Sequence, residues 1–218
     1  MTANTQIKLA NAKTCVDVGW YEYERIKAYE DRCLYLYGEI SNIDCDDKGL
    51  YFDSSMVSKL TEKILDFNRM DDGVAPEKRK PVRLYIHSPG GDVTEGFALV
   101  GAIEISKTPI YTINVGECCS MAFLICIVGA KRFTLPHSVF MMHEPSGLVL
   151  GKFSDMEDKI TFNKRFNASR IKDLVLKHSN MTEKEYNSVS KKDYYMLPED
   201  ALKHGFIDEI VTDIDTIL

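Results

Sequence analysis

The sequence lacks the features that would place the protein in a membrane or outside the cell. No stretch approaches the roughly 20 apolar residues of a transmembrane helix, so no membrane-spanning segment is expected. The N-terminal stretch MTANTQIKLANAKTC has no apolar core of the length that a secretory signal needs. We therefore expect a cytoplasmic protein, whose six cysteines are reduced rather than bridged.

Patterns typical of metal, redox or nucleic-acid proteins are also missing. No C-x-x-C pair occurs, which leaves a zinc site or a thioredoxin-like motif without support, and we expect neither a metal nor a cofactor. The formal charge of −6 argues against nucleic acid or an anionic membrane as the main partner. No repeat or linker divides the 218 residues, so we expect a single domain over 1–218, with 1–30 as a flexible or helical N-terminal segment.

What is present is an alternation of strand and helix patterns. The expected strands are 33–40, 82–88, 110–115, 131–136, 138–145 and one after Gly205. The expected helices are 52–70, 94–106, 120–128, a long amphipathic one over 154–178, one from Thr182 and one ended by Gly205. The first would be capped by Asp53 or Ser54, and Thr182 and Glu185 have capping-box spacing. The segment 71–81 has loop composition. This order predicts one α/β domain with a mostly parallel sheet covered by helices.

The first stretch with chemical potential is HSPGGDV, at 87–93. Adjacent glycines after a strand permit positive φ and a close backbone approach, with N–H groups directed outward. Such a turn suits an anion, a phosphate or a developing oxyanion. An ordinary strand-to-helix turn explains the glycines equally well.

The second stretch is NVGECCSMAF, where the reacting atom would be a sulfur of Cys118 or Cys119, the Ser120 hydroxyl, or none of them. Ser120 falls at the expected N-terminus of a helix, where a serine is most often only a cap. The same position suits a nucleophile whose intermediate is stabilised by the N–H groups of Met121 and Gly91. The pattern is not G-x-S-x-G, so the α/β-hydrolase elbow does not apply.

The third stretch is MMHEP, in which His143 ends an apolar strand. Chemistry in α/β proteins gathers at strand ends, although a lone histidine is more often structural. The other histidines, each with a structural explanation, are His87, His137, His178 and His204. The residues alone do not identify a carboxylate partner for His143. Glu144 would point to the opposite face of the strand. Nothing separates the remaining candidates, which are Asp155, Asp158, Asp193 and Asp200.

Taken together, three segments resemble the ClpP family, the proteolytic subunit of the Clp protease, a serine peptidase with a crotonase-like fold. YIHSPGGDVTEGFAL resembles the family's Y-I-N-S-P-G-G stretch, and GECCSMAFLICIVGAKRFTLPHSVFMMHEP resembles G-x-A-S-M followed by K-R-x-x-L-P-N-S-x-x-M-I-H-x-P. DYYMLPEDALKHGFIDEI resembles the ending D-R-x-x-S-A-P-E-A…G-L-I-D. The resemblance extends over about 85–211, in the family's order.

The resemblance implies a site and an assembly. Ser120 would be the nucleophile, His143 the general base and Asp193 its orienting partner, with the backbone N–H groups of Gly91 and Met121 as the oxyanion hole. The fold would consist of repeated ββα units, with a protruding handle helix at about 150–180. Homo-oligomeric rings of seven subunits, single or paired, would enclose a chamber. Peptides or unfolded proteins would be the substrates, and a separate ATP-driven unfoldase would deliver the unfolded chains. Any ATP use would belong to that partner, because this sequence has no G-x-x-x-x-G-K-[ST].

The sequence departs from the family pattern at several places. The family's Asn residues in the first and second segments are His87 and His137, and Glu117, Cys118 and Cys119 replace a Gln and two small residues. Its acidic–Arg pair at the ring–ring contact is Lys191-Lys192, and an aromatic of its unfoldase-docking pocket is Arg83. The segment 44–81 is longer than is typical of the family.

Three alternatives therefore stay open. A ClpP-related peptidase without an unfoldase, of the phage-maturation or signal-peptide-digesting type, fits the same residues. A non-catalytic ring subunit is disfavoured because all three triad candidates are present. An acyl-CoA enzyme of the crotonase superfamily would share the fold and the glycine turn, but the pairing of Ser120 with His143 favours a peptidase.

Overall fold

The computed structural model describes residues 5–8, 15–18, 27, 30–41, 44–45, 51–52, 56–146 and 150–218. Its centre is a seven-stranded sheet formed by β3 (Cys33–Tyr37), β6 (Val82–Ser88), β7 (Ile110–Cys119), β8 (Lys131–Thr134), β9 (Val139–Met142), β10 (Tyr194–Met196) and β11 (Glu209–Ile210). All neighbouring pairs are parallel except β9 with β10, which is antiparallel. The expected α/β fold with a mostly parallel sheet is confirmed.

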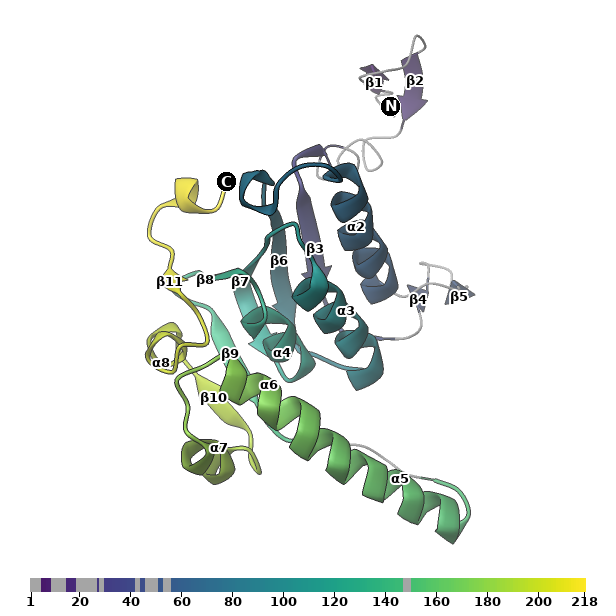
Figure 1. Ribbon diagram of the computed structural model, residues 1–218, viewed down its shortest axis with the longest axis vertical. Coiled ribbons are helices and arrows are strands. Elements are labelled where there is room, and N and C mark those ends of the chain that lie inside the picture. The colour runs from purple at the N-terminus through teal and green to yellow at the C-terminus, as the bar shows by residue number, and fades with distance from the viewer. Residues whose placement is uncertain are drawn as a thin grey trace.

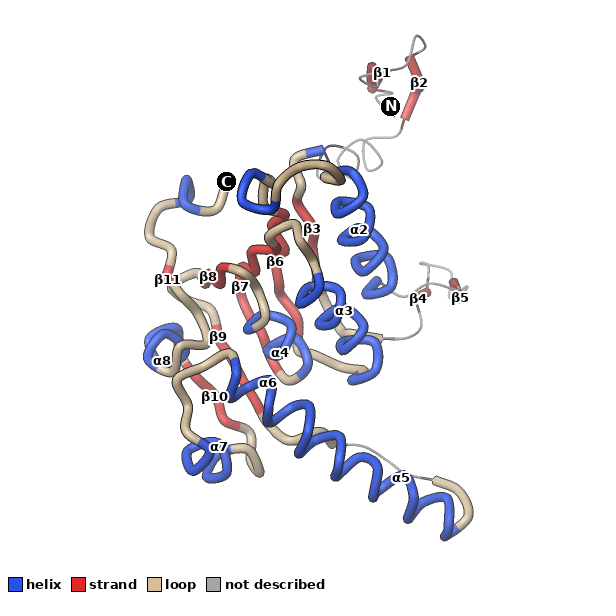
Figure 2. Tube along the Cα trace, viewed as in Figure 1, coloured by secondary structure: helices blue, strands red, loops and turns tan. Residues whose placement is uncertain are grey.

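The long strand β7 organises the sheet. Its first half pairs with β8, from Tyr111 opposite Lys131, and its second half pairs with β9, from Glu117 opposite Val139. The sheet order is therefore β10-β9-β7-β6-β3, with β8 and β11 as a side branch (Figure 2). This arrangement brings the end of β7, the end of β9 and the start of β10 to one edge of the sheet.

Helices cover one face of the sheet. These are α2 (Met56–Met70), α3 (Val93–Ile105) and α4 (Met121–Ile127) (Figure 1). The alternation of β3, in which Leu34 and Leu36 are buried while Tyr35 and Tyr37 are exposed, follows from this one-sided cover. On the opposite face a smaller cluster forms around Ile113, which packs with Phe133, Val211 and Ile217.

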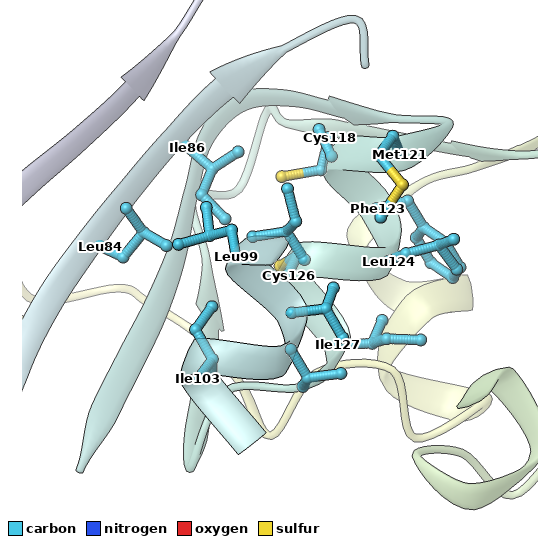
Figure 3. Packing of buried hydrophobic residues seen from close by; sticks show 14 of the residues in the cluster. Leu84, Ile86, Leu99, Ile103, Cys118, Met121, Phe123, Leu124, Cys126 and Ile127 are labelled. Carbon is cyan, nitrogen blue, oxygen red and sulfur yellow. The ribbon is translucent and has the colours of Figure 1, made fainter. Parts of the chain in front are cut away.

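The main core lies between the sheet and α2 to α4. Figure 3 shows Cys118 and Cys126 among the apolar side chains of β6, α3 and α4. All seven residues of α4 are buried, which explains why its sequence is apolar on every side.

A long helical arm extends away from the sheet (Figure 1). It consists of α5 (Phe153–Phe166), the π-helical turn η2 (Asn167–Ile171) and α6 (Lys172–Lys177), so the single helix expected over 154–178 is interrupted by one wider turn. The chain continues through α7 (Glu183–Val189), whose capping box of Thr182 and Glu185 is confirmed, and α8 (Pro198–Lys203). The chain also contains the short helices η1 (Pro76–Lys78) and η3 (Ile214–Thr216).

Some sequence-based expectations are wrong. The helix expected from residue 52 begins at Met56. Phe52 belongs instead to the two-residue strand β5 (Tyr51–Phe52), which pairs with β4 (Asp44–Cys45). The expected cap residues, Asp53 and Ser54, lie outside the described residues. Aromatic residues favour such an extended backbone. Within 1–30, expected to be flexible or helical, the structure describes the antiparallel pair of β1 (Thr5–Lys8) and β2 (Cys15–Val18) and the helical Lys27 and Glu30, so the expectation for the segment as a whole stays a prediction.

Two further differences bear on the site. The strand expected over 138–145 ends at Met142, so His143 lies just beyond it, and β10 was not expected at all.

Across the described residues, no helix is both long enough and apolar enough to cross a membrane.

Candidate active site

Ser120 occupies a strained turn between β7 and α4. Its backbone has φ 52° and ψ −120°, a region that non-glycine residues rarely adopt and that costs on the order of 1–3 kcal/mol. The Ser120 N–H donates to the Met141 carbonyl at 2.8 Å, which ties the turn to β9. Its side chain makes no capping hydrogen bond to α4, so the interpretation of Ser120 as an ordinary helix cap is wrong.

The Ser120 hydroxyl instead faces His143. The distance from Ser120 Oγ to His143 Nε2 is 2.8 Å, a hydrogen-bond distance. His143 directly follows β9, and β9 pairs with the end of β7 through Cys119 opposite Met141. The parallel register of two strands therefore brings a serine and a histidine together that lie 23 residues apart in the chain.

Asp193 completes this arrangement from a third segment. Its Oδ1 lies 3.1 Å from His143 Nδ1, on the side of the ring opposite to Ser120. In the antiparallel pair of β10 and β9, Tyr194 stands opposite Met142. Continuing that register by one residue sets Asp193 opposite His143. Local residue patterns left Asp193 among four candidates, because they gave no indication of β10, and only the family resemblance implied it.

The other carboxylate candidates are engaged elsewhere. Asp155 accepts a hydrogen bond from the Ser154 hydroxyl at 3.2 Å, out on the helical arm. Asp200 accepts the Leu197 N–H at 3.2 Å at the start of α8. Asp158 is exposed on α5.

The glycine turn packs directly against the Ser120 turn. A Cβ atom on Gly90, which has φ +96°, would lie 2.6 Å from the Cys119 carbonyl oxygen and 2.9 Å from the Met121 nitrogen. Gly91, with φ +143°, forms a bridge to Ile40 in which the Gly90 carbonyl and the Asp92 N–H make the hydrogen bonds. The Gly91 N–H is thus outside the bridge, and the Met121 N–H, first in α4, has no intrahelical acceptor. Met121 directly follows Ser120, and Gly91 directly follows the glycine that packs on the Ser120 turn.

A mostly apolar pocket opens beside Ser120 and His143. Its further lining residues are Val93, Met121, Phe123, Leu124, Met142, Pro145, Ile171, Val175, Tyr186 and Ser190. Burial, together with the negative charge of Glu144, raises the pKa of Tyr186, so its phenol stays neutral at pH 7. An apolar group next to a hydroxyl and an imidazole would fit this pocket. No pattern in the sequence indicated this pocket, because its walls come from five separate segments.

The cysteines beside Ser120 are poorly suited to nucleophilic chemistry. Cys118 is fully buried, and burial with neighbouring Cys126 raises the pKa of its thiol well above the ordinary value. Burial and the charge of Glu117 raise the pKa of Cys119 to about 11. Since the thiolate is the reactive form, neither sulfur is a nucleophile at neutral pH. Within the described part of the chain, no group of three or more His, Cys, Asp or Glu side chains could hold a metal ion.

The remaining histidines lie away from the Ser120 hydroxyl. His87 accepts the Glu117 N–H at its Nδ1, at 3.2 Å, and packs so closely on Gly116 that a Cβ there would lie 2.3 Å from that nitrogen. His178 contacts Glu104 at 3.4 Å, and His204 contacts the Tyr194 hydroxyl at 3.2 Å. The Glu117 backbone thus fixes His87, while the Glu117 carboxylate acts on the thiol of Cys119.

Comparison with known protein families gives one match. The model of the family described as Clp protease matches residues 56–213, well over half of the chain. The matched range contains Ser120, His143 and Asp193, together with the glycine turn. It begins where α2 begins and ends after β11.

Proposed function

The chain belongs to the Clp protease family, and from that premise we propose that it is a serine endopeptidase that hydrolyses peptides or unfolded polypeptides through an acyl-enzyme. The observation that carries the proposal is the hydrogen-bonded series from Ser120 Oγ through His143 to Asp193 Oδ1, with distances of 2.8 and 3.1 Å. A nucleophile, a base and an orienting carboxylate within hydrogen-bond reach are the geometric requirements of a serine triad.

In the proposed mechanism, Ser120 Oγ attacks the peptide carbonyl while His143 Nε2 accepts its proton. Asp193 holds the imidazole through Nδ1–H and stabilises the cation that forms. The N–H groups of Gly91 and Met121 would donate to the oxyanion, since both adjoin the Ser120 turn without a partner in their own element. His143 then protonates the departing amine, and water releases the acyl group from Ser120.

The substrate would present an apolar side chain to the pocket beside Ser120. Aliphatic and aromatic side chains form most of its lining, and Tyr186 and Ser190 add polar atoms at one side. A peptide bond next to a medium-sized apolar residue is therefore the expected target.

We further propose that the chain works as a homo-oligomer enclosing a chamber. Support comes from the helical arm, where Phe153 is 87% exposed and Ile160 and Phe162 are also exposed. Phe153 and Ile160 are seven residues, about two turns, apart and therefore share one face of α5. Exposed apolar side chains on one face of a protruding helix are typical of a protein–protein contact. Heptameric rings, single or paired, and delivery of substrates by an ATP-driven unfoldase belong to the same proposal, through the family.

A peptidase acting without an unfoldase is the second candidate, and Arg83 favours it. Arg83 stands where the family pattern has an aromatic of the docking pocket, and it donates instead to the Asp31 carbonyl at 2.9 Å. Degradation of a permanently unfolded protein by the purified chain, with no ATPase present, would support this candidate.

The decisive test is hydrolysis of a fluorogenic peptide with an apolar residue before the cleaved bond. We expect Ser120→Ala to abolish turnover, because no other nucleophile adjoins His143, and Cys118→Ala with Cys119→Ala to retain it. Equal turnover by wild type and Ser120→Ala would refute the serine mechanism. Loss in the cysteine variant alone would instead indicate thiol chemistry.

A further inference from the structure

The carboxylate of Asp193 is sparsely supported by its own surroundings. Its side chain is 57% exposed, and among the hydrogen bonds of the described residues it takes part in the one to His143. A triad carboxylate holds the histidine only if its own orientation is fixed. Because few side-chain contacts orient the Asp193 carboxylate, its orientation must come from the backbone of Asp193. That backbone is the start of β10, an edge strand of only three residues.

The backbone on the N-terminal side of Asp193 is tied to the histidine segment. The buried Ser190 accepts, through its carbonyl, the N–H of Glu144 at 2.7 Å. Glu144 directly follows His143, so this bond fixes the loop before Asp193 relative to the base. It does not by itself fix how the strand turns after Ser190.

On the C-terminal side, Tyr194 supplies the second attachment. Its hydroxyl lies 3.2 Å from His204 Nε2, and the two rings meet edge to face with centroids 6.1 Å apart. His204 is itself held at the end of α8, where its N–H donates to the Asp200 carbonyl at 3.0 Å and its carbonyl accepts the Asn180 N–H at 2.7 Å. The Tyr194 hydroxyl is therefore held by a histidine whose backbone is itself fixed.

The anchor continues through aromatic contacts toward the pocket. His204 packs on Phe206 with centroids 5.7 Å apart, and Phe206 meets Phe123 edge to face at 4.9 Å. Phe123 belongs to α4, the helix that begins directly after Ser120, and it lines the apolar pocket. The partner of Tyr194 is thus part of the same packed body as the nucleophile.

We propose that Tyr194 is a positioning residue for Asp193, and that its hydrogen bond to His204 aims the Asp193 carboxylate at His143. Adjacent residues of a strand point to opposite faces, so fixing the Tyr194 side chain fixes the rotation of the strand and with it the direction of Asp193. The proposal rests on the serine mechanism proposed above. The family ending that residues 193–210 resemble has an arginine where this chain has Tyr194, so the contact of Tyr194 with His204 is particular to this chain.

The test is a double-mutant cycle on the rate at which an activated ester acylates Ser120, which remains measurable in slow variants. Tyr194→Phe removes only the hydroxyl, and we expect the maximal rate to fall about three- to tenfold with KM unchanged, the effect of losing one hydrogen bond. In the Asp193→Asn background, the same substitution should cause no further loss. Tyr195→Phe, on the opposite face and 62% exposed, is the matched control and should behave as wild type.

Substitutions at His204 give a second measurement that leaves β10 unaltered. His204→Ala should reproduce the loss of Tyr194→Phe without adding to it, and His204→Gln, whose amide can reach the Tyr194 hydroxyl, should recover most of the rate. Thermal unfolding of each variant verifies that the fold is kept.

Two results would overturn the positioning role. One is an equal loss from Tyr194→Phe with and without Asp193, which would indicate an effect that does not pass through the carboxylate. The other is a wild-type rate for a folded Tyr194→Phe. If Ser120→Ala retained full activity, the serine mechanism itself would fail, and that outcome is distinguishable because it does not depend on Tyr194.

Discussion

At the scale of single residues, the site depends on one backbone conformation and the group packed against it. Ser120 adopts a positive φ at which its hydroxyl points to His143 instead of capping α4. Strain of this kind persists only where the surroundings impose it. Here the surroundings are the Met141 carbonyl on one side and Gly90 on the other.

Gly90→Ala should therefore damage both activity and stability. Any Cβ at this position would press on the Cys119 carbonyl at 2.6 Å, which is backbone and can move only with Ser120. We expect peptide turnover to fall at least tenfold, since small displacements of a nucleophile are costly. Turnover and urea unfolding measured on the same preparation separate the two effects.

Gly73→Ala is the control for Gly90→Ala. Gly73 has a similar φ of +80°, but nothing lies within 4 Å of the added Cβ. It should lose about 1 kcal/mol of stability for the backbone strain alone and keep full turnover. Equal loss of turnover in both variants would contradict the packing argument.

At the scale of elements, a single arginine holds the C-terminal segment to the sheet. Arg132 in β8 pairs with Asp208 through Nε at 3.1 Å and Nη2 at 2.5 Å, while its Nη1 donates to the carbonyls of His178 and Gly205 at 2.9 and 2.8 Å. Because His178 ends α6, while Gly205 and Asp208 lie between α8 and β11, the guanidinium joins three segments. Planar, bidentate contacts of this type are the ones for which arginine is suited.

This ion pair predicts a pH-dependent contribution to stability. Burial would raise the pKa of Asp208, but the hydrogen bonds and charge of Arg132 outweigh it and hold the pKa below its ordinary value. A depressed folded-state pKa adds stability above the unfolded value of about 4, which is lost as the pH falls through the lower folded value.

Asp208→Asn tests that contribution. Because Asp208 is partly exposed, we expect a cost of only about 1 kcal/mol at pH 7, which shrinks as the pH is lowered below about 4. Urea unfolding at a series of pH values measures it. Asp215→Asn, in the same segment but without contact to Arg132, should show no such trend, and a cost independent of pH at Asp208 would contradict the assignment.

At the scale of the whole molecule, one long helical arm packs on the body through its inner end, where Phe166 meets Phe97 and Leu174 and Val175 are buried, while its outer helix is exposed. The arm formed by α5, η2 and α6 extends from the body, and its outer helix α5 has no buried residue. Helices in water gain most of their stability from packing an apolar face. The exposed Phe153, Ile160 and Phe162 are therefore expected to pack against another copy.

A variant carrying Phe153→Glu and Ile160→Glu should have a lower solution mass than wild type. Charges placed on an apolar contact must be desolvated there, which weakens association. Light scattering coupled to size-exclusion chromatography measures the mass. Lys159→Glu, a charge reversal at an exposed neighbour on the same helix, is the control, and an unchanged mass in the double variant would contradict a role of this arm in assembly.

Much of the local structure followed from the sequence by itself. The apolar periodicity of 82–88, 94–106 and 110–115 predicted β6, α3 and β7, because the period of the pattern reports directly on strand or helix. The Thr182 and Glu185 spacing predicted the cap of α7, since both capping partners lie within one turn. Ser120 and His143 were candidates because each lies at the end of an expected element, and the family resemblance implied their roles.

Only the tertiary structure decided how those pieces combine. Asp193 meets His143 through the antiparallel register of β10 on β9, a pairing between segments about 50 residues apart that no local pattern encodes. The family resemblance implied the Ser120 hydroxyl, and burial, which the letters CCS do not reveal, adds a physical reason against the adjacent thiols by raising the pKa of Cys118 and Cys119. Register and burial are properties of the packed chain, and the proposed chemistry depends on both.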